Sequence, residues 1–241
     1  MFRNRKAVDQ TLEDRMKENY ENVYRIYLPR RMPVVIRLDG KAFHTFTHHM
    51  KKPFDSDLMI LMRDTARYLM ENIQNCVLGY TQSDEISLLL MNYKKFNTCS
   101  WFDNNLQKMV SVSAAMASSF FSVEYSTRTD KSKFIQFDSR VFVLPEAEVN
   151  NYFLSRQKDC ERNAIQMIGQ SHYSQKTLHG KKCVDIVEMI KNDEHVVKKY
   201  NDYSFYERNG MVLVNNGAML LEHKFKDNPK LVQDLLMPEE I

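Results

Sequence analysis

Two aspartates stand where apolar segments end or begin. Asp39 closes the run 34–38, and Asp84 precedes the run 86–90. An acid at the mouth of a buried strand has a rigid support, and carboxylate oxygens are the ligands that Mg²⁺ prefers. Two such acids can cradle divalent metals and a nucleotide triphosphate, so the two segments together predict a metal–phosphate site. Asp39 taken alone is more often a turn or helix cap, and the matching Asp84 segment reverses that preference.

Other phosphate and metal sites are disfavoured. The six glycines form no Gly-x-Gly-x-x-Gly or Gly-x-x-x-x-Gly-Lys segment, so metal ions and basic side chains must hold any phosphates. The histidines at 44, 48 and 49 have no cysteine or acid at zinc-ligand spacing. The four cysteines form no CxxC pair, which predicts reduced, mostly buried thiols in a cytoplasmic protein. No apolar run approaches the length of a membrane span, so we expect no membrane partner.

The elements that position the two acids alternate between strands and helices. We expect a strand ending near Asp39, a helix over 55–74, strands over 76–80 and 86–91, a helix over 106–125 and a strand over 134–144. This order is that of a ferredoxin-like domain, the layout of polymerase palms and nucleotide cyclases. In that topology the end of the first strand lies beside the central hairpin, so Asp39 and Asp84 converge.

We therefore expect an α/β (α+β) protein with one nucleotidyltransferase domain over 1–241. Its palm core spans about 30–145, and helices and a hairpin are added over about 146–241. A polar helix is expected in the first thirty residues, a long helix with Pro145 at its first position, and a helix over 184–191. The segment 203–206 is expected to pair with 211–214, with Asn209-Gly210 in the turn.

Three blocks carry a resemblance. They are Arg37-Leu38-Asp39-Gly40-Lys41-Ala42-Phe43-His44 with Lys52-Pro53-Phe54-Asp55, then Tyr80-Thr81-Gln82-Ser83-Asp84-Glu85-Ile86-Ser87, then Phe137-Asp138-Ser139-Arg140 with Arg156-Gln157-Lys158-Asp159-Cys160. In this order and spacing, over about 20–215, the chain resembles the tRNA-histidine guanylyltransferase family and its guanylyltransferase-like relatives.

The resemblance implies roles for particular residues. Two Mg²⁺ ions would be held by Asp39, Asp84 and the carbonyl of Gly40. The nucleotide-binding residues would be Lys41, Ala42, Phe43, His44, Lys52, Ser83, Asp84, Arg140 and Lys191. Of these, His44, Lys52 and Ser83 would lie at the nucleotide that activates the RNA end, and Arg140 and Lys191 would contact the triphosphate. Glu85 and Asn163 are expected to support the site from behind, since Glu85 should point to the opposite face from Asp84.

The resemblance also implies a reaction. ATP would activate a 5′-monophosphorylated tRNA, and the 3′-hydroxyl of GTP or another nucleoside triphosphate would attack that end, in the opposite direction to ordinary polymerisation. As in other phosphoryl transfers, the enzyme would accelerate the reaction mainly by positioning the reactants and neutralising their charge. The family is expected to assemble as homotetramers.

One departure narrows the expected task. Where enzymes dedicated to tRNA-histidine carry His-Ile-Asn-Asn, this chain has Glu161-Arg162-Asn163-Ala164. This favours the branch that repairs tRNA 5′ ends by copying a template strand, with base pairing supplying specificity. Three alternatives stay open: addition of a single G at position −1 of tRNA-histidine, a palm-type nucleotide cyclase, and a non-catalytic RNA-binding protein.

Overall fold

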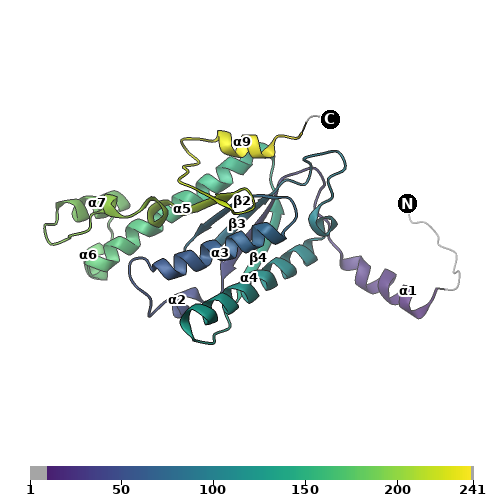
Figure 1. Cartoon of the computed structure of the whole chain (residues 1–241), viewed down its shortest axis with the longest axis horizontal. Coiled ribbons are helices and arrows are strands. Elements are labelled where there is room, and N and C mark those ends of the chain that lie inside the picture. The colour runs from purple at the N-terminus through teal and green to yellow at the C-terminus, as the bar shows by residue number, and fades with distance from the viewer. Residues whose placement is uncertain (1–9, 240–241) are drawn as a thin grey trace.

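The computed structural model describes residues 10–239, whose centre is one six-stranded antiparallel sheet in the order β4-β1-β3-β2-β5-β6 (Figure 1). The strands are β1 (Val34–Gly40), β2 (Cys76–Gln82), β3 (Glu85–Leu90), β4 (Phe137–Val143), β5 (Met211–Val214) and β6 (Met219–Leu221). The helices are α1 (Leu12–Met16), α2 (Phe43–Phe46), α3 (Ser56–Asn72), α4 (Leu106–Thr129), α5 (Glu146–His172), α6 (Gln175–Leu178), α7 (Cys183–Asn192), α8 (Phe205–Asn209) and α9 (Lys230–Leu236).

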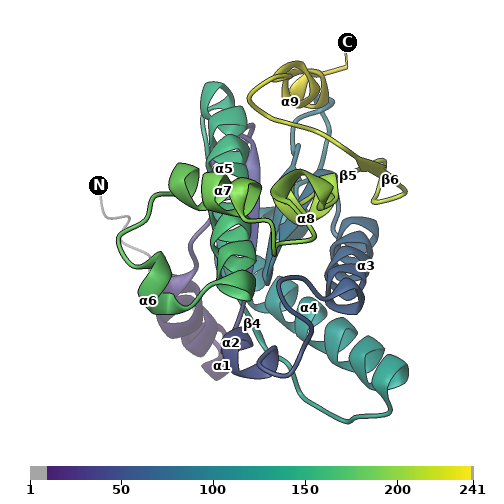
Figure 2. The ribbon, with the colours of Figure 1, turned by 90° about the vertical axis from the view of Figure 1, so that its left-hand side faces the viewer.

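The first four strands have the predicted ferredoxin-like arrangement. Their order, β4-β1-β3-β2, places the two central strands β1 and β3 side by side. Helices α3 and α4 cover one face of the sheet, and α5 crosses the other (Figure 2). Strands β5 and β6 extend the sheet beyond β2.

Alternation along β1 divides the core into two layers. Val34, Ile36 and Leu38 are buried in the layer shared with α3 and α4, which also contains the aromatic cluster Phe43, Phe46, Phe121 and Phe137. Val35 points to the other layer, which packs beneath α5. Successive strand side chains point to opposite faces, so Arg37 and Asp39 lie on the α5 side of the sheet.

Polar caps fix where the two helices on the first face begin. The Asp55 side chain accepts hydrogen bonds from the backbone N–H groups of Asp57 and Leu58, and the Asn105 side chain accepts one from Lys108. These bonds satisfy N–H groups that have no partner within the helix. The predicted starts of α3 and α4 are therefore confirmed, although α4 continues to Thr129.

Two C-terminal predictions are wrong. The segment 203–206 does not form the predicted strand. Residues 205–209 form helix α8, because Ser204 and Glu207 make a reciprocal capping box and Gly210, with φ of 75°, ends the helix. The hairpin is formed instead by β5 and β6, joined through Asn215, Asn216 and Gly217. Pro145 also lies one position earlier than predicted, since it is the N-cap of α5.

The N-terminal segment is helical over Leu12–Tyr24, as a short α-helix followed by π and 3₁₀ turns, and it stands apart from the body (Figure 1). The remainder of the polar helix predicted for the first thirty residues includes residues 1–9, which lie outside the described range. Of the four thiols, those of Cys76 and Cys160 are buried, whereas Cys99 is exposed. Within residues 10–239 no helix is long and apolar enough to cross a membrane.

His223 makes the fold sensitive to acid. Its imidazole is 6% exposed and lies 4.8 Å from the ring of Phe225, and its Nε2 has no hydrogen-bond partner within residues 10–239. The amide of Gln157 holds this segment by donating to the His223 carbonyl at 2.8 Å and accepting from the Phe225 N–H at 3.0 Å. Burial lowers the pKa of His223 below its ordinary value.

This burial predicts a pH-dependent stability. The unfolded chain takes up the proton first, at a pH of about 6.5, so the free energy of unfolding should be highest above that pH and fall as the solution is acidified. In urea unfolding at a series of pH values, H223F should show a smaller loss between pH 7 and 5 than the unsubstituted chain. The exposed-histidine control H179Q should leave the slope unchanged. An unchanged slope in H223F would contradict the assignment.

Candidate functional site

The fold brings the two predicted acids together at one corner of the sheet. Asp39 is the penultimate residue of β1, and Asp84 lies in the turn between β2 and β3, after Ser83 with φ of 50°. The backbone N–H of Gly40 donates to the carbonyl of Asp84 at 3.1 Å. The end of β1 is therefore tied directly to the turn.

This corner carries uncompensated negative charge. Neither Asp39 nor Asp84 makes an ion pair with any residue of the described range. Burial and the nearby charge of Asp39 raise the pKa of Asp84, against the opposing effects of its hydrogen bonds and of Arg37. Carboxylates held close together without a cationic partner are an electrostatic cost that a bound cation removes.

These residues fit a magnesium site. Mg²⁺ is usually held by one or two carboxylates together with substrate phosphates and water, instead of an all-protein cage. Asp39, Asp84 and the Gly40 carbonyl supply hard oxygen ligands of this kind. Consistently, residues 10–239 contain no cluster of three or more His, Cys, Asp or Glu side chains that would form a closed metal site.

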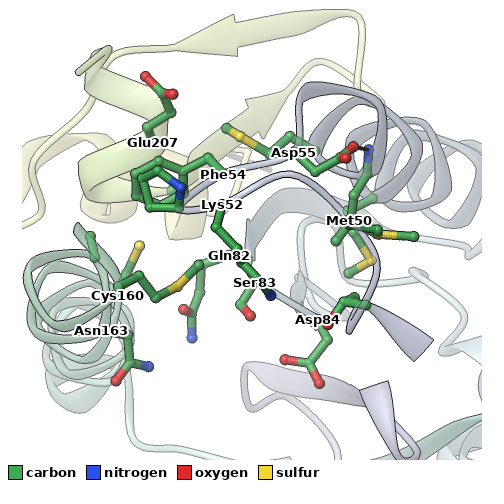
Figure 3. A pocket seen from close by; sticks show the side chains of 18 of the residues that line it. Met50, Lys52, Phe54, Asp55, Gln82, Ser83, Asp84, Cys160, Asn163 and Glu207 are labelled. Atoms are coloured by element: carbon green, nitrogen blue, oxygen red, sulfur yellow. Dashed lines mark hydrogen bonds between the residues drawn. The ribbon is translucent and has the colours of Figure 1, made fainter. Parts of the chain in front are cut away.

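A cavity of about 590 Å³ opens beside Asp84. Its walls come from helix α5, the segment that joins α2 to α3, the β2–β3 turn and helix α8 (Figure 3). The polar and titratable side chains that line it are His44, Thr47, Lys51, Lys52, Asp55, Thr81, Gln82, Ser83, Asp84, Cys160, Asn163, Gln170, Ser171 and Glu207. The volume is that of a typical small-molecule site.

Lys52 is a cation that faces Asp84 across this cavity. Its side chain extends from the segment before α3 toward Ser83 and Asp84 (Figure 3). The segment is anchored by Asp55, whose carboxylate accepts from the Lys51 N–H at 3.1 Å while it caps α3. Since Lys52 itself has no ion pair within residues 10–239, its ammonium is available to an anionic ligand.

Helix α5 forms the opposite wall. Cys160, Asn163 and Ala164 line the cavity. Their neighbours Glu161 and Arg162 point away from it, to ion pairs with Lys224 and Asp159 respectively. Burial raises the pKa of the Cys160 thiol to about 12, so this cysteine is not an activated nucleophile.

The structure does not bring every predicted binding residue into the cavity. Phe43 and His44 line it, whereas Lys41 lies outside, with its ammonium 3.1 Å from Oε1 of Gln136. Arg140 is exposed on the edge strand β4, 3.7 Å from Asp138, and Lys191 is exposed on α7. Ala42 precedes α2 with a left-handed φ of 56°.

Sequence reasoning missed the contribution of α8. Tyr206 and Glu207 line the cavity, but the segment was predicted as a strand. The Ser-x-x-Glu spacing of Ser204 and Glu207 is a helix-start signal that would have indicated it.

Comparison with protein families shows to which family the chain belongs. The family described as "Thg1: tRNAHis guanylyltransferase" matches residues 13–145, which include both acids, Lys52 and the whole palm core. The chain belongs to the Thg1 family.

Similar proteins support the same assignment. The chain is 34% identical over 197 residues to a mouse protein named probable tRNA(His) guanylyltransferase, a match that covers 75% of this chain and 64% of that protein. A Schizosaccharomyces pombe tRNA(His) guanylyltransferase is 32% identical over 153 residues, covering 61% of this chain and 56% of the relative. The chain thus spans less than two thirds of the length of these Thg1 relatives.

Solved structures match along almost the whole chain. A bacterial Thg1-like protein in complex with ATP has a TM-score of 0.89 and 38% identity, over 94% of this chain and 99% of that chain. A bacterial Thg1-like protein in complex with GTP has a TM-score of 0.80 and 36% identity over the same shares. The Saccharomyces cerevisiae enzyme, at 19% identity and a TM-score of 0.71, shows the shared fold.

A side chain at position 40 should lower the stability of the fold. A Cβ at Gly40 would lie 2.1 Å from Cδ2 of Phe43, a ring packed within the aromatic cluster. G40A should therefore lower the free energy of unfolding by about 1–3 kcal/mol, the usual cost of overpacking. The measurement is urea unfolding, with A42G as a matched control, because a left-handed φ suits glycine. Equal stability of G40A and the unsubstituted chain would show that Phe43 moves aside freely.

Proposed function

We propose that this Thg1-family chain is a magnesium-dependent nucleotidyltransferase that adds nucleotides in the 3′-to-5′ direction to the 5′ end of tRNA. The observation that carries the proposal is the acid pair Asp39 and Asp84, which has no ion pair within residues 10–239 and of which Asp84 lines a cavity into which Lys52 projects. The ATP and GTP complexes of similar bacterial proteins support ATP and a second nucleoside triphosphate as its substrates.

The position of each residue in the site indicates its role. Asp39, Asp84 and the Gly40 carbonyl would hold two Mg²⁺ ions, which when bound neutralise phosphate charge. Lys52 and the Ser83 hydroxyl face the same space and can orient a phosphate for in-line attack. Arg140 and Lys191, which lie outside the cavity, would act on the triphosphate of the incoming nucleotide. Asn163 would support the ligand from the α5 wall.

Template-dependent repair of the 5′ end is the task that we favour. Two of the residues that replace the His-Ile-Asn-Asn tract, Glu161 and Arg162, are engaged in ion pairs outside the cavity. The site has no added polar side chain from these positions to select guanine, so pairing with a template base would select the nucleotide. The family likeness also supports a homotetramer in the cytoplasm.

Addition of a single G to tRNA-histidine is the second candidate, because the mouse and fission yeast relatives carry that name. A panel of 5′-truncated tRNAs, each incubated with ATP and one nucleoside triphosphate at a time, separates the two. Template repair adds only the nucleotide complementary to the opposing base. Addition of G opposite any base would establish the single-G activity, and a cyclic product with no RNA-linked label would overturn both.

Removal of either acid should stop the chemistry and spare RNA binding. D39A and D84A should each lower the rate of nucleotide addition by about three orders of magnitude, since metal-ion stabilisation of phosphoryl transfer is worth several kcal/mol. Single-turnover assays with labelled 5′-monophosphorylated tRNA measure the rate, and filter binding measures RNA affinity. D103A, at an exposed aspartate paired with Arg30, is the control. Loss of RNA binding with unchanged chemistry would contradict these roles.

Lys52 should matter for nucleotide affinity and little for stability. K52M should weaken ATP binding about tenfold, the scale of one charge-assisted contact to phosphate. Its melting temperature should stay close to that of the unsubstituted chain, because the ammonium has no partner in residues 10–239 to lose. Calorimetric titration with ATP tests this, with K131M as an exposed control. Unaltered ATP affinity would remove Lys52 from the site.

A further inference from the structure

The arginines around the acid pair are all engaged by other carboxylates. Arg37 and Arg140 lie on the same face of the sheet as Asp39, one on β1 and one on the neighbouring β4. Arg37 pairs with Glu85 at 2.6 Å, and Arg140 lies 3.7 Å from Asp138. Neither pairs with Asp39. The negative charge of Asp39 and Asp84 is therefore not paired with either of these arginines, although both lie on the same face of the sheet as Asp39.

Glu85 lies beside both acids and is the carboxylate that pairs with Arg37. It follows Asp84 in the chain and is the direct partner of Asp39 in the β1–β3 ladder. Its carboxylate is buried and contacts two guanidinium groups: Oε2 forms an ion pair with Nη2 of Arg37 at 2.6 Å, and Oε1 accepts a hydrogen bond from Nε of Arg156 at 2.9 Å. Both oxygens of this carboxylate are therefore already paired with guanidinium groups.

Arg37 is the side chain that could change partner. It precedes Asp39 by two residues, so both side chains leave β1 on the same face. Its Nε is buried without a hydrogen-bond partner in the described chain, so the ion pair to Glu85 is what fixes the guanidinium. Its positive charge already opposes the rise in the pKa of Asp84, which places it within electrostatic range of the acids.

We infer that Glu85 is a positioning residue that holds Arg37 away from Asp39 and Asp84 and so keeps these two carboxylates free for cations. The inference rests on the proposed function, in which the two acids are metal ligands. Once released, Arg37 would pair with one of them, because an arginine–carboxylate pair gains both charge and hydrogen bonding. A monovalent guanidinium would then compete with the divalent ion for the same oxygens.

Arg156 contacts the other oxygen of Glu85. It comes from α5, its side chain is 15% exposed, and it also pairs with Asp159 on the same helix. The Glu85 carboxylate is thus fixed from a helix on one side while it binds Arg37 from the strand on the other. Loss of Arg156 leaves the Arg37–Glu85 pair in place, which makes it a matched control for loss of an arginine contact to Glu85.

Mn²⁺ binding to the full, nucleotide-free chain tests the inference without reference to activity. Free Mn²⁺ is followed by electron paramagnetic resonance during titration, and folding of each variant is checked by circular dichroism. E85Q should weaken Mn²⁺ binding about five- to tenfold, the scale of one partly exposed ion pair. The double variant E85Q/R37M should recover the affinity to within about twofold. R37M and R156M should each bind as tightly as the unsubstituted chain or more tightly.

The rescue separates positioning from a merely structural role, because a structural role predicts that the double variant binds more weakly than E85Q. Unchanged affinity in E85Q, or no recovery in E85Q/R37M, overturns the inference. If E85Q does not fold, R37M decides: weaker Mn²⁺ binding in R37M would show that Arg37 supports the acids. Failure of the proposed metal site looks different, since Mn²⁺ binding would then be absent or unaffected by D39A and D84A.

Discussion

The structure depends on one short backbone contact, the hydrogen bond from the Gly40 N–H to the Asp84 carbonyl. It joins the end of a strand to a turn that lies far along the chain, and each of these segments carries an aspartate that has no ion pair in the described part of the chain. The contact requires the absence of a side chain at Gly40, because Phe43 occupies that space. The aromatic cluster beneath the corner thus sets the spacing of the acids above it.

Charge is distributed around this corner in a graded way. Among residues 10–239, Asp39 and Asp84 have no ion pair, the neighbouring Glu85 has two cationic partners, and the edge-strand acid Asp138 has one, at 3.7 Å. Across the cavity Lys52 is left unpaired within the described residues. The acids can therefore attract a cation, and Lys52 can attract an anion. A ligand that combines a metal ion with phosphate groups needs both kinds of charge.

The palm core could be predicted from the sequence because its signals are local. Apolar runs 34–38 and 86–90 specify central strands, Asp55 caps α3, and the element order specifies the topology that brings Asp39 to Asp84. The segment 203–206 was wrongly predicted as a strand because its aromatic residues are typical of strands. The capping box of Ser204 and Glu207 instead makes a helix begin there. The ion pair of Glu85 with Arg156 could not be predicted, because it depends on the rotation of α5 about its axis over the sheet.

Helix α5 has a mechanical consequence. It is one unbroken helix of 27 residues, and it carries Arg156 against the acid corner and Asn163, two turns later, in the cavity wall. A helix without a proline or glycine break between these positions transmits a displacement and does not absorb it. A ligand that displaces the cavity wall at Asn163 should therefore also displace Arg156, which pairs with Glu85.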